Sequence, residues 1–243
     1  MSGICTVCPR HCGVIREASV GKGFCKMGEN AVVARVAKHM WEEPCISGTR
    51  GGGTEFSSGC VLKCVFCQNY KISTQNFGKE LTARQLADCY KRLEQQGVHN
   101  INLVNPTHFL NAVIESLNIY RPAVPVVYNC GGYESVETLR QLEGRVDIYL
   151  PDLKYADGQL AGQLSAAPDY FPVAAAAIRE MFRQTGPCVL EDGLLKRGVV
   201  IRHLVLPGQL DNTRRCIDWV AENFQPGEVL FSLMSQYTPQ PDA

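Results

Sequence analysis

The sequence lacks any apolar run long enough to cross a membrane. Its first residues, "MSGICTVCPRHCGVIRE", carry cysteine and arginine where a secretory signal needs an uninterrupted apolar stretch. It also lacks net charge, because 24 basic side chains balance 24 acidic ones. These absences argue against a membrane or nucleic-acid partner, and we expect a cytoplasmic protein.

Cysteine, in contrast, is abundant, with 12 in 243 residues. Thiols stay reduced in the cytosol, so this number indicates metal or redox-cofactor ligation rather than a disulfide framework. Hydrophobic residues make up 45% of the chain and charged residues 20%, values typical of one soluble globular core.

The chain divides into three parts. We predict a cysteine-rich head that binds a metal or cluster (residues 1–35), a glycine-rich linker (36–53) and a body (54–243). Six short apolar runs in the body are candidate strands: "TEFSS", "NINLVN", "VPVVYN", "VDIYLP", "GVVIRHLVLPG" and "EVLFSLM".

Helical spacing separates these runs. One helix should begin at Thr82, where Gln85 three residues later completes a capping box, and should end before Gly97. Such alternation predicts parallel pairing, in either a doubly wound sheet or a barrel, and we favour a partial (β/α)6 barrel. The sequence stops after the sixth run, so the sixth helix should be missing, because the chain is short or truncated. One flank of the last strand should then be exposed or covered by a partner.

The carboxyl ends of parallel strands meet at one edge, where reactive groups gather. Polar residues follow each run: the cysteines after the first, then Asn105 and Thr107 with His108, then Asn129 with Gly131 and Gly132, then Asp152 and Lys154, and finally Ser235 and Gln236. The fifth run itself contains Arg202 and His203. Alternation along a strand sends these two side chains to opposite faces, and Arg202 has the better claim as an anion anchor.

The stretch "SSGCVLKCVFCQN" (residues 57–69) forms what we call the three-cysteine loop, with Cys60, Cys64 and Cys67 in the pattern C-x3-C-x2-C. Structural zinc and electron-transfer 4Fe-4S clusters normally take four protein ligands. Three thiolates leave one iron of a 4Fe-4S cluster open to a small chelating molecule. The loop therefore indicates a reactive cluster.

This pattern resembles the signature of the radical S-adenosylmethionine enzymes. "GTEFSSGCVLKCVFCQN", "DLK" and "HLVLPG" are similar to the branch related to pyruvate formate-lyase activating enzymes, and "CTVCPRHCGVIRE" and "WEEPCISG" to an activating-enzyme-like subgroup with a four-cysteine N-terminal motif. The resemblance implies a radical S-adenosylmethionine barrel. The cluster would cleave S-adenosylmethionine reductively, giving a 5′-deoxyadenosyl radical that abstracts a substrate hydrogen.

The resemblance also implies cofactor-binding residues. Asp152 and Lys154 match positions that contact the ribose and carboxylate of the cofactor, and Phe66 matches a position beside the adenine, although Phe66 fits equally well as an apolar plug. The other predicted cofactor contacts are Gln68, Asn69, Asn105, Thr107, Asn129, Arg202 and Gln236.

The sequence departs from the family's pattern at two places. "VNPTHF" replaces the glycine-glycine-glutamate motif after the second strand, so Asn105 or Thr107 would supply oxygens to the cofactor amino group. Gln236 replaces a histidine. "NCGGY" is interpreted as a turn, His203 as a packed or solvated histidine, and His108 equally as a helix cap or a pocket residue.

In the head, Cys5, Cys8, Cys12 and Cys25 provide four thiols, suited to zinc or an auxiliary 4Fe-4S cluster, with His11 as an alternative ligand. The remaining cysteines lack ligand spacing and should be buried: Cys45, Cys89, Cys130, Cys188 and Cys216. Of these, Cys45 and Cys130 come nearest to the predicted rim.

The resulting hypothesis is an iron-sulfur enzyme of the radical S-adenosylmethionine type, reduced by a partner such as flavodoxin or ferredoxin. By resemblance alone, its product would be a glycyl radical on a partner protein. Modification of a peptide or small metabolite is the enzymatic alternative, and an electron-transfer or metal-binding protein is the non-enzymatic one.

Overall fold

The computed structural model describes residues 4–17 and 21–239. Residues 1–3 and 18–20 of the predicted head and residues 240–243 of the body lie outside this description. The described strands are β1 (Ala31–His39), β2 (Gly52–Ser57), β3 (Lys79–Leu81), β4 (Ile101–Val104), β5 (Val126–Cys130), β6 (Ile148–Pro151), β7 (Val189–Glu191), β8 (Leu194–Leu204) and β9 (Leu230–Met234).

The six predicted strands correspond to β2, β4, β5, β6, β8 and β9, and each is parallel to the next. The sheet order is β3-β1-β2-β4-β5-β6-β8-β7, with β9 paired to β8. A curled sheet with unjoined ends is a partial barrel, which confirms that prediction.

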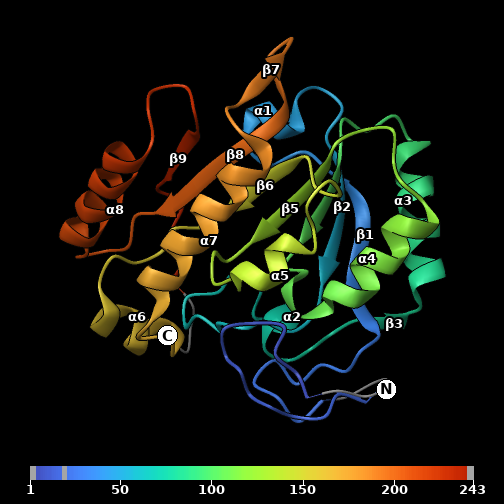
Figure 1. Ribbon diagram of the computed structural model, residues 1–243, viewed down its shortest axis with the longest axis horizontal. Coiled ribbons are helices and arrows are strands. Elements are labelled where there is room, and N and C mark those ends of the chain that lie inside the picture. Colours follow the sequence, from blue (N-terminus) through green and yellow to red (C-terminus); the bar gives the residue numbers. More distant parts are fainter. Residues whose placement is uncertain (1–3, 18–20, 240–243) are drawn as a thin grey trace.

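Helices follow the strands, and α3, α4, α5 and α7 lie together against one face of the sheet (Figure 1). Their bounds are α1 (Pro44–Ser47), α2 (Tyr70–Ser73), α3 (Ala83–Glu94), α4 (Leu110–Ile119) after a short 3-10 turn η1 (Thr107–Phe109), α5 (Val136–Arg140), α6 (Gly158–Ser165), α7 (Tyr170–Thr185) and α8 (Leu210–Asn223). The capping box of α3 is confirmed, because Gln85 N donates to Thr82 Oγ1 at 3.3 Å and Thr82 N to Gln85 Oε1 at 2.9 Å. Among the described helices, none combines the length and apolar character needed to cross a membrane.

The segment expected as a linker, 36–53, is built into the barrel. Its start belongs to β1, which pairs antiparallel with both β2 and β3. Its centre forms α1, whose fully buried Ile46 packs against Val127 and Ile148. In Figure 1, α1 lies at one end of the sheet and the head lies at the other. The run "AVVARVAKH" has the β-branched, part-alternating character of a strand, which explains why it joins the sheet.

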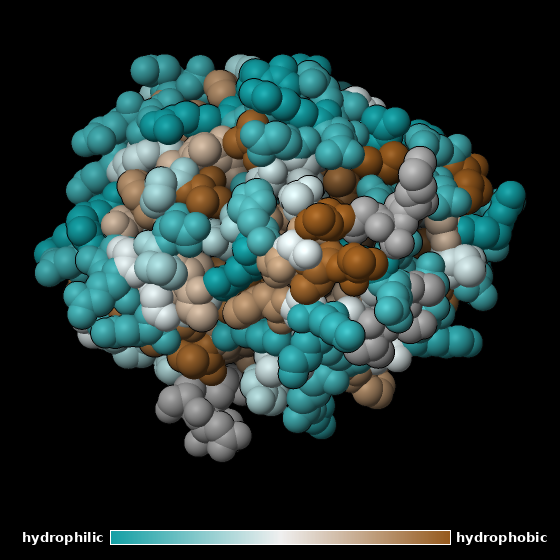
Figure 2. Space-filling model, turned by 60° about the horizontal axis from the view of Figure 1, so that its bottom comes forward, coloured by the Kyte–Doolittle hydropathy of each residue, from teal (hydrophilic) through white to brown (hydrophobic). Residues whose placement is uncertain are grey.

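Up to residue 30 the described part of the head has little regular structure, apart from an antiparallel bridge between Ile4 and Ile15, and its last residues begin β1. Both side chains are more than half exposed, at 67% and 62%. Figure 2, which turns this end of the molecule forward, shows hydrophobic side chains gathered on that face among hydrophilic ones.

A buried acid on β2 makes stability depend on pH. Glu55 is 1% exposed, its carboxylate accepts hydrogen bonds from Ser57 Oγ at 3.0 and 3.2 Å, and burial raises its pKa from 4.5 to about 8. Between these two values the folded state holds a proton that the unfolded state releases. Glu55 should therefore contribute a fall in the free energy of unfolding of about 1.4 kcal/mol per pH unit as pH rises from 4.5 to 8.

Urea unfolding of the metal-free protein at several pH values measures this slope. The Glu55→Gln variant should lose this contribution to the slope, whereas Glu115→Gln, at an exposed position on α4, should keep it. Equal slopes for the wild type and the Glu55→Gln variant would contradict the assignment.

Candidate functional site

A cavity of about 650 Å³ lies inside the curl of the sheet, with walls contributed by β1, β2, β4, β5, β8 and β9 and by the segment that follows β6. It brings together every predicted cluster and cofactor residue of the body except Thr107: Cys60, Cys64, Phe66, Cys67, Gln68, Asn69, Asn105, Asn129, Asp152, Lys154, Arg202 and Gln236. The parallel strands cause this convergence, since these residues lie on or just after strand ends or in the three-cysteine loop.

Each sulfur of the three-cysteine loop accepts a hydrogen bond. Leu62 N donates to Cys60 Sγ at 3.3 Å, the Ser73 hydroxyl to Cys67 Sγ at 3.3 Å, and the Ser165 hydroxyl to Cys64 Sγ at 2.9 Å. Hydrogen bonds of this kind stabilise ligating thiolates and tune the potential of a cluster.

These thiols fit a 4Fe-4S cluster in number and surroundings. Among the residues that the structure describes, no three His, Cys, Asp or Glu side chains already stand at metal-binding positions. Burial raises the pKa of Cys60 to about 11 and also raises that of Cys64. Ligation would therefore require both reorientation and deprotonation of these side chains, with the iron replacing the protons.

Opposite charges meet on the cavity wall around Arg202. Its Nε donates to Asp152 Oδ1 at 2.9 Å and its Nη2 to Asn129 Oδ1 at 2.8 Å, while Lys154 also pairs with Asp152. Burial by itself would raise the pKa of Asp152, but Arg202 and Lys154 lower it below the ordinary value. Asp152 is therefore ionised, and the wall offers both a carboxylate and cations to a ligand.

Glu42 is the functional candidate that the sequence analysis missed. It precedes α1 and lines the cavity, where its Oε2 accepts from Arg202 Nη1 at 3.3 Å and Asn129 Nδ2 at 3.2 Å. Burial raises its pKa to about 7, although Arg202 acts to lower it. The motif "WEEPCISG" was the available signal, but it was used only to assign a subgroup.

Two residues after β4 lie elsewhere than predicted. Thr107 is fully buried and donates to Glu134 Oε1 at 2.8 Å, so it does not reach the cavity. His108 neither caps a helix nor lines the cavity, because its Nε2 lies 2.6 Å from the Ser58 carbonyl oxygen. Asn105 does line the cavity, but its amide nitrogen donates to Gly59 O at 2.5 Å.

The alternation predicted for β8 is confirmed. Arg202 faces the cavity, whereas His203 is fully buried on the opposite face, between Leu153 O at 2.6 Å and Thr213 Oγ1 at 2.9 Å. In NCGGY, Asn129 and Cys130 end β5, and the chain then bends at Gly132, which has a φ of +78°.

Other predicted residues have additional contacts. Gln68 donates through Nε2 to Gln236 O at 3.0 Å and to Thr238 Oγ1 at 3.2 Å. Phe66 both lines the cavity and packs against the core, so its two interpretations remain open. Cys130 is buried and lines the cavity, while Cys89 and Cys216 are buried away from it. Cys45 and Cys188 are only partly buried and also lie away from the cavity.

The four head thiols influence one another electrostatically. Burial raises the pKa of Cys8 to about 12, with the charges of Cys25 and Cys5 adding to it. Burial also raises the pKa of Cys25, where Cys5 and Cys12 add and Arg16 opposes. Among the described residues, no three of these thiols already stand at metal-binding positions, so zinc or a cluster in the head remains a prediction.

Comparison with known proteins supports the fold. No family model matches the chain. The uncharacterized protein MJ0674 of Methanocaldococcus jannaschii is 30% identical over 246 residues, which cover 97% of this chain and 66% of MJ0674. The chain therefore spans just under two thirds of the length of that relative.

Two solved structures are similar at low identity. Streptococcus suis SuiB bound to S-adenosylmethionine has a TM-score of 0.54 and 14% identity, covering 77% of this chain and 40% of SuiB. Methylornithine synthase, PylB, has a TM-score of 0.53 and 18% identity, covering 77% of this chain and 53% of PylB. The chain thus shares the partial α/β barrel of these two proteins, which agrees with the predicted fold class.

One tyrosine on α7 holds two strand ends of the site together. The fully buried Tyr170 hydroxyl lies 2.8 Å from Gly131 O and 2.7 Å from Asp152 O, and accepts from Lys154 N at 3.0 Å. Tyr170→Phe would leave these groups unpaired and should lower the free energy of unfolding by about 1–3 kcal/mol. Urea unfolding of the metal-free protein measures the loss.

Tyr70→Phe, at a half-exposed position on α2, is the matched control and should change stability little. If Tyr170→Phe is as stable as this control, the hydroxyl does not hold the strand ends.

Proposed function

We propose that this protein is an iron-sulfur enzyme that reductively cleaves S-adenosylmethionine and uses the resulting radical to abstract a hydrogen atom from a substrate. The observation that carries the proposal is the position of Cys60, Cys64 and Cys67, which line one cavity with a wall of mixed charge. SuiB, which shares the fold, has been solved with S-adenosylmethionine bound.

The mixed wall suits the cofactor because S-adenosylmethionine carries an ammonium, a carboxylate, a sulfonium and ribose hydroxyls. In the proposed complex Lys154 pairs with the carboxylate and Asp152 accepts hydrogen bonds from the ribose. Glu42 and Asn129 offer further oxygens on the same wall. The chain lacks the glycine-glycine-glutamate motif that the resemblance leads one to expect after the second predicted strand. For Lys154 to pair with the cofactor carboxylate, its present ion pair with Asp152 must weaken.

When bound, the cluster supplies the electron that splits S-adenosylmethionine into methionine and a 5′-deoxyadenosyl radical. The chain contributes the three thiolates, the hydrogen bonds that stabilise them, and a cavity whose inner wall is buried. On that wall the side chains of Arg202 and Glu42 are only 15% and 11% exposed, which limits the contact of a ligand there with solvent.

The proposal extends to the class of substrate from which the hydrogen atom is taken. Resemblance favours a glycyl radical on a partner protein, with flavodoxin or ferredoxin as reductant in the cytoplasm. Modification of a peptide or small metabolite is the alternative. It draws support from two proteins of the same fold: SuiB, solved with its precursor peptide SuiA, and PylB, a methylornithine synthase.

The product 5′-deoxyadenosine tests the reaction directly. Anaerobic reconstitution with iron and sulfide, dithionite reduction and addition of S-adenosylmethionine should yield it, and Cys60→Ala, Cys64→Ala and Cys67→Ala should each reduce the yield to background. Cys216→Ala, a buried cysteine on α8, is the control and should stay active. A wild-type protein with a full cluster and no product would leave only the electron-transfer or metal-binding alternative.

Metal analysis decides what the head binds. We expect about four additional irons per chain for an auxiliary cluster, or one zinc for a structural site, and Cys8→Ser together with Cys25→Ser should abolish either. Elemental analysis of the purified protein measures both. A metal content unchanged in this double variant would contradict a head metal site.

A further inference from the structure

The head residue Arg10, which lies in the four-cysteine motif, contacts the body far from its own position in the sequence. Its Nε donates to Val61 O at 2.7 Å, its Nη2 to Ser165 O at 3.0 Å, and its Nη1 to Ala166 O. The latter two carbonyls lie in the last turn and the C-cap of α6, where backbone acceptors lack partners within the helix. One planar guanidinium thus connects α6 with the three-cysteine loop.

Both connections reach a predicted cluster ligand. Val61 directly follows Cys60 in the chain, and the hydroxyl of Ser165 donates to Cys64 Sγ at 2.9 Å. Arg10 therefore fixes the backbone beside one ligand and the hydrogen-bond donor of another.

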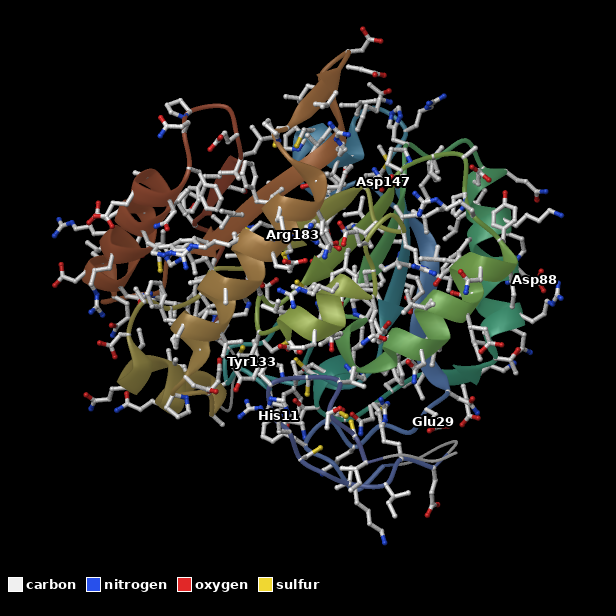
Figure 3. The ribbon with its side chains drawn as sticks, viewed as in Figure 1. His11, Glu29, Asp88, Tyr133, Asp147 and Arg183 are labelled. Atoms are coloured by element: carbon white, nitrogen blue, oxygen red, sulfur yellow. The ribbon has the colours of Figure 1, made fainter. Side chains whose placement is uncertain are left out.

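Aromatic rings support the guanidinium from the head and from the loop after β5. The Arg10 guanidinium carbon lies 3.9 Å from the centroid of the Phe24 ring and 5.2 Å from that of Tyr133, and Lys63 Nζ lies 5.1 Å from the Phe24 centroid. Figure 3 shows Tyr133 and His11, the neighbour of Arg10, together at the end where the head meets the barrel.

A second contact with the head restricts the start of the three-cysteine loop, at Gly59. Gly59, with a φ of +80°, has no room for a side chain, because an added Cβ would lie 2.6 Å from Met27 Cγ, 3.1 Å from Cys25 O and 3.1 Å from His108 Nε2. The residue before Cys60 is thus held between the head and η1.

The other arginine of the four-cysteine motif, Arg16, helps to hold the same end of the loop. Arg16 is 8% exposed and donates to the carbonyls of His108 and Gly28. His108 in turn donates through Nε2 to Ser58 O, 2.6 Å away. The carbonyls of residues 58 and 61 are therefore held, directly or through one side chain, by the two head arginines.

We propose that the head acts as a clamp that holds the three-cysteine loop in the shape required for cluster ligation, with Arg10 as its positioning residue. Identifying the loop as the cluster site rests on the proposed function, whereas the clamp itself is a property of the metal-free chain. A metal bound to Cys8 and its partners would fix the backbone two residues from Arg10 and thereby tighten the clamp.

Hydrogen exchange of the metal-free protein tests the clamp before any cluster is present. In Arg10→Ala the backbone amides of residues 60–67 should exchange about tenfold faster, while those of α7 stay unchanged. Arg10→Lys is the critical variant, because lysine keeps the charge over Phe24 but has no planar fork to bridge three carbonyls. It should exchange as fast as Arg10→Ala in residues 60–67.

Arg214→Ala, at a position with a 73% exposed side chain on α8, is the matched control and should exchange like the wild type. After reconstitution, the Arg10 variants should also lose loop-bound iron to a chelator faster than the control does. Unchanged exchange in residues 60–67, or full restoration by Arg10→Lys, would overturn the clamp. If Arg10→Ala does not fold, the comparison of Arg10→Lys with the wild type still decides.

The two proposals fail separately. A wild-type protein that forms no 5′-deoxyadenosine would refute the proposed reaction and leave the exchange result standing. An active wild type with no Arg10 effect on exchange or iron retention would refute only the clamp.

Discussion

The parallel pairing of β2, β4, β5, β6 and β8 is the constraint on which the site depends. Parallel strands bring their carboxyl ends to one edge, so residues from distant parts of the sequence meet there. The three-cysteine loop leaves β2 at the same edge where Asp152 leaves β6. An antiparallel neighbour in the middle of this sheet would send one of these groups to the opposite end.

Bringing charged side chains together in the cavity wall removes them from water, which is unfavourable. The contacts around Arg202 offset this desolvation. Removing a guanidinium and two carboxylates from water is unfavourable unless each charge is paired and hydrogen-bonded. Arg202 contacts Asp152, Glu42 and Asn129, and Lys154 gives Asp152 a second cation. A pair of hydrophobic residues would stabilise the fold as well or better, so these charges make most sense as groups that a polar ligand engages.

Sequence patterns predicted the features that depend on local order. The spacing of Cys60, Cys64 and Cys67, the opposite faces of Arg202 and His203, and the parallel pairing of the six runs follow from periodicity and from where each run ends. Features that depend on partners distant in sequence were missed or misplaced. Glu42 reaches the cavity only because α1 closes the barrel end, and Thr107 turns away because a buried glutamate, Glu134, accepts its hydroxyl.

The same distinction explains why the head was the hardest part to interpret. Its four cysteines were recognised by spacing, which says nothing about what lies between them. The residues between them, Arg10 and Arg16, donate to backbone carbonyls of the body and of the head itself, and no sequence pattern marks a carbonyl as an acceptor.

Lys63 has a φ of +55° in the three-cysteine loop, a left-handed conformation that is unfavourable for a residue with a side chain and must be held by its surroundings. In the proposed cluster site all three thiols come from this single loop, and contacts that restrict its shape would lower the entropy lost on ligation. The head therefore differs from an independent metal-binding module, because Arg10 donates to the loop at Val61 O and Arg16 holds His108, which donates to Ser58 O.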